Sequence, residues 1–232
     1  MIFENVKTFT IPEGTVRRIT SGGIILWEED YRDVYQRLDY IVSDGNQYFI
    51  TDFIADNESG MELTAELEFI YHTQVPMGSC INTNTGLFYI IHPMSETSCY
   101  YGFNTGNTVD YSANDHQKYR FQTNFCNNRK IGMYIDGLSV IPSIMSNISS
   151  TLPQQTVPIG ILACTKGDGS VATPRALTFY NAKISQGSEV VREYIPCYRK
   201  SDNIVGLYEI YTGEFLINLG SGEFEIGNEI DW

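Results

Sequence analysis

Residues 61–69 read MELTAELEF, and this stretch decides the fold class of the chain. Its apolar residues occupy every second position, and Glu or Thr occupies each position between them. Successive side chains of a β-strand point to opposite faces, so this alternation predicts a strand with one buried face and one face in water. The chain is therefore expected to contain at least one half-buried β-sheet.

Short apolar and aromatic runs continue on both sides of this stretch, separated by turn signals. Residues 118–125, 175–184 and 205–211 are rich in β-branched or aromatic residues. Asp136-Gly137 is a dipeptide that right-twisted hairpins favour. No long stretch shows helical periodicity, and no repeat of solenoid length is visible. Many short strands with closely spaced turns predict an all-β protein, built as a sandwich or a barrel.

The closing stretch at residues 205–224, VGLYEIYTGEFLINLGSGEF, predicts a final set of short strands joined by glycine turns. Gly213 and the turn Gly220-Ser221-Gly222 are expected where the backbone needs positive φ. Ser221 lies outside any G-x-S-x-G pattern and is interpreted as a turn residue. The residues expected to help fill the core are Leu207, Phe215, Leu216 and Phe224. The residues expected to keep exposed edges charged are Glu209, Glu214, Glu223 and Glu225.

Residues 1–30 are predicted to form a short N-terminal β segment. It contains two or three short strands, and so few strands are marginally stable alone. The segment should therefore pack on the main domain or on a partner, and we interpret it as a docking element. The remaining residues, 31–232, are expected to form one β-sandwich domain.

The chain is acidic, with a formal net charge of -13 and a pI near 4.5. Such a field repels a phosphate backbone, so nucleic acid is excluded as a partner. We expect no membrane insertion, because no apolar run is long enough to span a bilayer, and no secretory signal peptide is recognised. The five cysteines are scattered without a C-x-x-C pair. This favours buried thiols made in a reducing compartment, with one disulfide as the alternative.

Two groups of carboxylates are candidates for catalysis. Glu66 and Glu68 alternate along one strand, as the acids of sandwich glycosidases do. The favoured alternative is the solvated outer face of an amphipathic strand. Glu229-x-Asp231 begins an E-x-D-x-E pattern, but its third acid is missing and a terminal strand is expected to fray. We therefore predict a protein without enzymatic activity, with no catalytic residue, metal site or cofactor.

Residues 98–116, SCYYGFNTGNTVDYSANDH, are the best candidate for a ligand-binding loop. Aromatic faces stack on the C–H surfaces of sugars, while amides and carboxylates bond the hydroxyls. An ordinary loop between strands is the alternative. The candidate ligand-binding residues are Tyr100, Tyr101, Asn104, Asp110 and Asp115.

Several stretches resemble a known family of domains. Residues 35–53 (YQRLDYIVSDGNQYFITDF), 132–140 (GMYIDGLSV) and the closing module at 175–224 resemble concanavalin-A-like, laminin-G-like jelly-roll domains of tailed bacteriophages and of bacteria. Residues 6–28 are similar to a small β segment that precedes such domains in phage virion proteins. The resemblance implies an antiparallel β-sandwich with jelly-roll topology.

The same resemblance implies a bacteriophage virion structural protein with a lectin-like domain in the tail, fibre or capsid surface. Its expected role is assembly, decoration or adsorption to a host-surface glycan. Its expected partners are other virion proteins, through the N-terminal segment, and host-surface polysaccharide; it is expected to be a homo-oligomer in a virion assembled in the host cytoplasm. The alternative is a non-catalytic bacterial carbohydrate-binding or adhesion module. A glycan hydrolase is disfavoured by the missing acid constellation.

Overall fold

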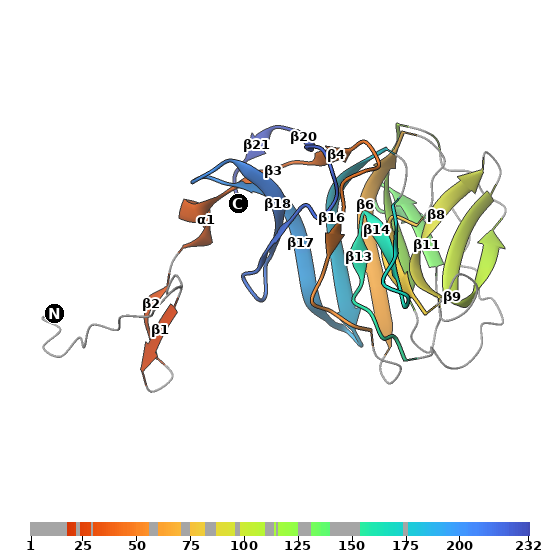
Figure 1. Cartoon of the computed structure of the whole chain (residues 1–232), viewed down its shortest axis with the longest axis horizontal. Helices are drawn as coiled ribbons and strands as arrows, with labels where there is room; N and C mark the ends of the chain where they lie inside the picture. Colours follow the sequence, from red (N-terminus) through yellow and green to blue (C-terminus); the bar gives the residue numbers. More distant parts are fainter. Residues whose placement is uncertain are drawn as a thin grey trace, which may run out of the picture.

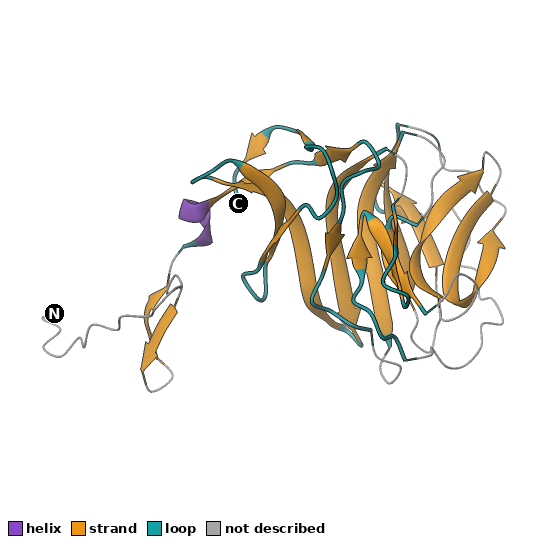
Figure 2. Ribbon diagram, viewed as in Figure 1, coloured by secondary structure: helices purple, strands orange, loops and turns teal. Residues whose placement is uncertain are grey.

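β-Strands and their loops make up almost all of the described chain (Figure 2). The computed structural model describes residues 18–21, 24–28, 30–55, 60–70, 75–81, 87–95, 98–109, 114, 116–124, 131–139, 154–173 and 176–232. Within these ranges the only helix is α1 (Tyr31–Val34), which begins where the Asp30 side chain accepts a hydrogen bond from the Arg32 N–H at 2.9 Å. The predicted all-β class is confirmed.

The larger sheet contains 12 strands. They are β3 (Tyr35–Leu38), β4 (Ile41–Ser43), β6 (Met61–Phe69), β10 (Lys118–Asn124), β11 (Ile131–Ile135), β12 (Leu138–Ser139), β16 (Leu177–Gln186), β17 (Glu189–Arg199), β18 (Ile204–Glu209), β19 (Phe215–Ile217), β20 (Glu225–Ile226) and β21 (Glu229–Ile230). The main path runs β12-β11-β10-β6-β16-β17-β18-β19. β4 also pairs with β16, β3 with β17, β20 with β4, and β21 with β3. All of these pairs are antiparallel.

The smaller sheet contains 7 strands and forms the second layer of the sandwich. They are β5 (Phe49–Ile50), β7 (Met77–Cys80), β8 (Leu87–Ser95), β9 (Ser98–Val109), β13 (Gly160–Ile161), β14 (Ala163–Lys166) and β15 (Val171–Ala172). Figure 1 shows β13 and β14 in front of β6 and β16 of the larger sheet. β7 and β14 run parallel, so the sandwich departs from a purely antiparallel arrangement at this pair.

Strand β6 is where the opening prediction is tested most directly. Its residues alternate between buried and partly exposed along the whole strand. β6 pairs with β10 on one side, where Leu67 faces Tyr119, and with β16 on the other, where Leu67 faces Phe179. All three side chains are buried in the main core between the sheets. The predicted half-buried strand is therefore confirmed, and its neighbours extend the same apolar face.

The N-terminal hairpin consists of β1 (Arg18–Ser21) and β2 (Ile24–Glu28). The two strands pair with each other and form a sheet of their own. Figure 1 shows this hairpin outside the sandwich, next to α1. The proposed division between residues 1–30 and 31–232 stays a prediction.

The closing stretch largely follows its prediction. Leu207, Leu216 and Phe224 are buried in the main core, and Phe224 stacks on Phe49 of β5 with ring centroids 5.2 Å apart. Gly213 and Gly222 have φ of 74° and 79°, as the predicted turns require. Gly220 does not have positive φ; the backbone of Asn46 lies so close to it that a Cβ would overlap the Asn46 carbonyl oxygen. Glu214, Glu223 and Glu225 are exposed.

Two side chains of the closing stretch differ from their predictions. Glu209 is 0% exposed, because its carboxylate accepts hydrogen bonds from the backbone N–H groups of Glu193 and Thr212. Phe215 packs against a second cluster rather than the main core. The buried members of that cluster are Tyr35, Ile195, Cys197 and Tyr208.

The C-terminal tail is held in place, which contradicts the expectation that it frays. Strand β21 pairs with β3, and Trp232 lies edge-on to Tyr31 with ring centroids 4.7 Å apart. The Trp232 indole N–H also donates a hydrogen bond to the Tyr35 carbonyl at 3.2 Å. An aromatic anchor and two hydrogen-bonded strands therefore join the end of the chain to the start of the domain.

Candidate functional site

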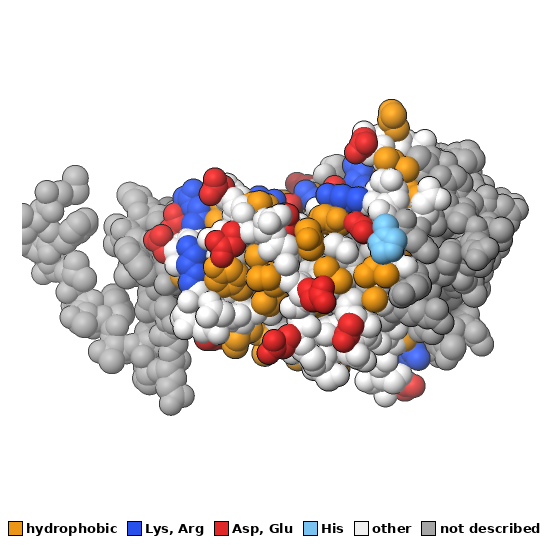
Figure 3. All heavy atoms as spheres, turned by 90° about the horizontal axis from the view of Figure 1, so that it is seen from above, with side chains coloured by type: hydrophobic (Ala, Val, Ile, Leu, Met, Phe, Trp, Pro, Cys, Tyr) orange, Lys and Arg blue, Asp and Glu red, His pale blue; other side chains and the backbone are white. Residues whose placement is uncertain are grey.

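A polar groove lies on the outer face of the larger sheet. It has a volume of about 290 Å³. Its lining residues are Glu66, Gln117, Lys118, Arg120, Tyr134, Asp136 and Gly137. They come from β6, β10, β11 and the β11–β12 turn, in which Asp136 and Gly137 both have positive φ, as the predicted hairpin turn requires. We call this feature the outer-face groove. Figure 3 shows Lys and Arg side chains along a hollow in the surface.

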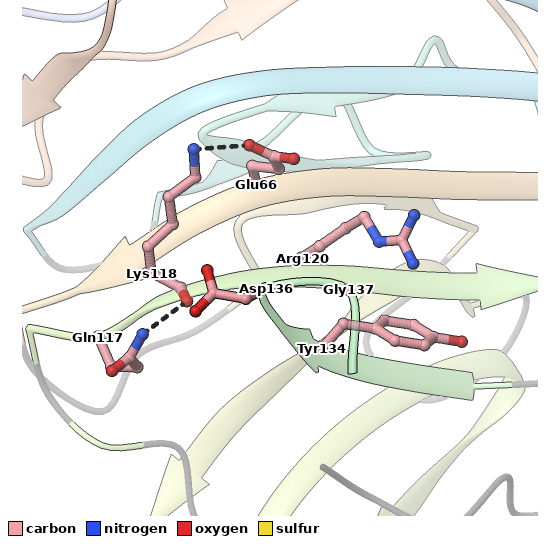
Figure 4. Close-up of a pocket in the computed structure, with 7 residues that line it drawn as sticks. All are labelled: Glu66, Gln117, Lys118, Arg120, Tyr134, Asp136 and Gly137. Atoms are coloured by element: carbon pink, nitrogen blue, oxygen red, sulfur yellow. Dashed lines mark hydrogen bonds and ion pairs between the residues drawn. The ribbon is translucent and has the colours of Figure 1, made fainter. Parts of the chain in front are cut away.

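Arg120 and Tyr134 form one wall of the outer-face groove. They face each other in register across β10 and β11, and the guanidinium carbon lies 4.4 Å from the centre of the tyrosine ring. Figure 4 shows both side chains pointing in the same direction. A Cβ at Gly132 would overlap the Tyr134 ring, so this glycine leaves room for the ring to lie along the strand. Contact with the Tyr134 ring holds the Arg120 guanidinium in one orientation. The N–H groups of the guanidinium then point outward in its own plane.

Lys118 occupies a similar position over a second tyrosine. Its ammonium nitrogen lies 4.0 Å from the centre of the Tyr180 ring and 2.7 Å from Oε2 of Glu66. Lys118 pairs in register with Glu68, so its side chain reaches diagonally to meet Glu66. Two cations two residues apart on β10 therefore each lie on an aromatic face.

Tyr180 lies at a β-bulge of β16. The register against β6 shifts between Phe179 and Asn181, which leaves Tyr180 as the extra residue. Its hydroxyl donates a hydrogen bond to Oε2 of Glu68 at 2.9 Å. Partial burial first, and then this bond to an anion, raise the pKa of the Tyr180 hydroxyl. Tyr180 thus lies beside the acidic pair, although it is 112 residues away from Glu68 in sequence.

Both members of the acidic pair on β6 interact with neighbouring side chains. Glu66 is bound by Lys118, and Glu68 is bound by Tyr180 and lies 3.7 Å from Nδ1 of His116. A two-carboxylate hydrolase needs one acid to protonate the leaving group and the other to act on the sugar or on a water. The arrangement here forms a hydrogen-bonded surface network, which is what a solvated outer face is expected to contain.

The predicted ligand-binding residues fall in a different part of the fold. Tyr100, Tyr101 and Asn104 lie in the long strand β9, not in a loop, and Tyr100 pairs in register with His92 of β8. Their side chains lie outside the described part of the structure, as do residues Asp110 and Asp115 altogether. Whether these five residues meet at one site stays a prediction.

Sequence analysis did not single out Lys118, Arg120 or Tyr134, although it predicted a strand at residues 118–125. Lys118, Arg120 and Tyr134 become neighbours only because β10 lies between β6 and β11. The one visible signal was the Asp136-Gly137 turn, which fixes the register of the β11–β12 hairpin. In the described ranges, no group of three or more His, Cys, Asp or Glu side chains is arranged to hold a metal ion.

Comparison with known proteins gives no match to this chain, either among family models or among curated proteins. Within the described part of the chain, no helix has the length and apolarity needed to cross a bilayer.

Proposed function

We propose that this chain is a structural protein of a bacteriophage virion, whose β-sandwich binds a host-surface polysaccharide without cleaving it. Two features support the proposal. The closing module, with its strands and glycine turns, resembles phage jelly-roll domains, and the sandwich has the layered all-β architecture that such a module implies. The N-terminal hairpin forms a separate small sheet, which suits a docking element for another virion component.

The observation that carries the binding proposal is the pair of stacked cations in the outer-face groove. Among the described residues no carboxylate is ion-paired with Arg120, and we expect its N–H groups to bind the ligand. A planar guanidinium fixed on a tyrosine offers two parallel donors to a carboxylate or to neighbouring hydroxyls. Asp136 and Glu66 add acceptors at the same groove. Donors and acceptors on a rigid sheet match the hydroxyl-rich and acidic surface of a polysaccharide.

Affinity electrophoresis through gels that contain purified bacterial surface polysaccharide tests the binding site. Arg120→Ala should weaken retention at least about tenfold, because a charge-assisted hydrogen bond contributes roughly 1.5–3 kcal/mol. Arg199→Ala is the matched control, since Arg199 also lies over an aromatic ring, that of Phe215, outside the groove. Equal retention of Arg120→Ala and the wild type would remove the groove from the site.

Two further measurements separate the proposed class from its alternatives. Immunogold labelling of purified phage particles should place the protein on the virion; labelling of the bacterial surface alone would favour an adhesion module. Release of reducing sugar from the polysaccharide, abolished by Glu66→Gln or Glu68→Gln, would show a hydrolase and overturn the non-catalytic assignment.

A further inference from the structure

Two buried cysteines form a sulfur pair on neighbouring strands of the smaller sheet. Cys80 ends β7, Cys164 lies in the parallel strand β14, and their Sγ atoms are 3.8 Å apart. The two residues are 3% and 4% exposed and form a small cluster of their own, separate from the main core. Among the described residues, the hydrophobic side chains that pack against this cluster are those of Val75 and Ala172, which are both partly exposed.

The two thiols differ in their readiness to react. The hydrogen bond from the Cys164 thiol, assisted by the Lys166 ammonium, holds the pKa of Cys80 below the usual value for a thiol, although burial opposes it. The same hydrogen bond and burial raise the pKa of Cys164. Cys80 is thus the thiol that reacts as a thiolate, and Cys164 is the one that follows.

The backbone places the two sulfurs diagonally across the strands. Cys80 pairs in register with Lys166, and Cys164 pairs with Gly78, so the cysteines are offset by two residues on the same face of the sheet. A disulfide requires a sulfur separation of about 2.0 Å, so bond formation must draw the end of β7 toward β14. A bond formed against such an offset is more easily reduced than an unstrained one.

We propose that Cys80 and Cys164 are a reversible disulfide site, reduced in a reducing compartment and closed by low-molecular-weight disulfides outside it. The Cys80 thiolate attacks one sulfur of the small disulfide and expels a thiolate, which leaves a mixed disulfide on Cys80. Cys164 then loses its proton, attacks the Cys80 sulfur and expels the second thiolate. Two protein thiols thereby lose two electrons and two protons, and the small disulfide becomes two thiols. This inference is independent of any ligand or particle.

Peptide mapping of the full chain after native treatment with oxidised glutathione tests the site. Cys99→Ser and Cys126→Ser are introduced together, so that the thiols present are Cys80, Cys164 and Cys197. The expected result is one linked peptide containing Cys80 and Cys164, the loss of two titratable thiols, and their recovery with excess reduced glutathione. Retention of all three thiols, or a linked peptide that contains Cys197, would overturn the proposal.

Cys197 provides the matched control within the same protein. It is fully buried, and burial raises the pKa of its thiol to about 12. It should remain a thiol throughout the treatment. Cys164→Ala should trap glutathione on Cys80, whereas Cys80→Ala should leave Cys164 unmodified. Equal modification in the two variants would contradict the assigned order of attack. If either variant fails to fold, peptide mapping of the Cys99→Ser/Cys126→Ser chain still decides whether the disulfide forms.

Discussion

The carboxylate of Glu209 accepts a hydrogen bond from the backbone N–H of Glu193 at 2.8 Å, and its second oxygen accepts one from the N–H of Thr212. One buried side chain therefore joins the long strand β17 to the turn that follows β18. Because the carboxylate is 0% exposed, these backbone donors have no water to replace it. Glu209 is a structural residue of the closing hairpin.

Glu209→Ala should lower the free energy of unfolding by about 2–4 kcal/mol, since it leaves two backbone donors without an acceptor. Urea denaturation followed by circular dichroism measures the change. Glu223→Ala is the control, because Glu223 is exposed in the same closing stretch, and it should change stability by less than about 0.5 kcal/mol. Similar losses in both variants would contradict the special role of Glu209.

Gly132→Ala should disturb the outer-face groove without touching a ligand. The added methyl group would overlap the Tyr134 ring, so the ring must move. The Arg120 guanidinium would then lose the aromatic face on which it lies. Retention on polysaccharide gels should fall nearly as far as in Tyr134→Ala. Tyr134→Phe keeps the ring and should bind like the wild type; if Gly132→Ala also does so, the stack is not part of the site.

Trp232→Ala should loosen the junction between the C-terminus and α1. The indole contacts Tyr31 and Tyr208 and donates to the Tyr35 carbonyl, so its loss should cost about 1–3 kcal/mol of unfolding free energy. Amide hydrogen exchange should also become faster in β3 and β21. Tyr211→Ala, which removes an exposed aromatic residue, is the control, and equal exchange in both variants would argue against the anchor.

The ion pair between Asp52 and Arg192 should make stability depend on pH. The Arg192 guanidinium donates to both carboxylate oxygens, at 3.1 and 2.8 Å, and holds the pKa of Asp52 below its ordinary value of 3.8. A lowered carboxyl pKa gives stability that is complete above the ordinary value and is lost as the pH falls through the lower, folded-state value.

Asp52→Asn should therefore destabilise the protein by about 0.5 kcal/mol near neutral pH, because the carboxylate is partly exposed to screening solvent. The difference from the wild type should shrink as the pH falls below 3.8 and through the lower, folded-state pKa of Asp52. Denaturation at a series of pH values measures this. Asp136→Asn removes another exposed charge and serves as the control; a difference for Asp52→Asn that stayed constant with pH would rule out the linkage.

Local patterns were sufficient to predict the parts of the fold that depend on neighbours in sequence. The alternation of β6 predicted its buried face, and the glycines at 213 and 222 predicted two turns with positive φ. Glu209 was predicted to be exposed but is buried, because its carboxylate accepts a hydrogen bond from the backbone of the turn after β18. The alternation of apolar and charged residues does not show which backbone N–H groups need an acceptor.

The outer-face groove depends on strand order, which local patterns do not encode. Arg120 meets Tyr134 only through the pairing of β10 with β11, and Tyr180 meets Lys118 only because β6 pairs with β16 on one side and with β10 on the other. The parallel pairing of β7 with β14, which brings Cys80 to Cys164, was equally invisible in the spacing of the cysteines.

The pairing of β3 with β21 determines how the domain responds to mechanical load. The strands are antiparallel, with Arg37 opposite Ile230 and Leu38 opposite Glu229, so tension applied through the two ends of the domain separates their hydrogen bonds one after another. Bonds loaded in sequence break at lower force than bonds sheared together. Under tension, the short β3–β21 pairing and the Trp232 contact should therefore break first, while the sandwich core remains folded.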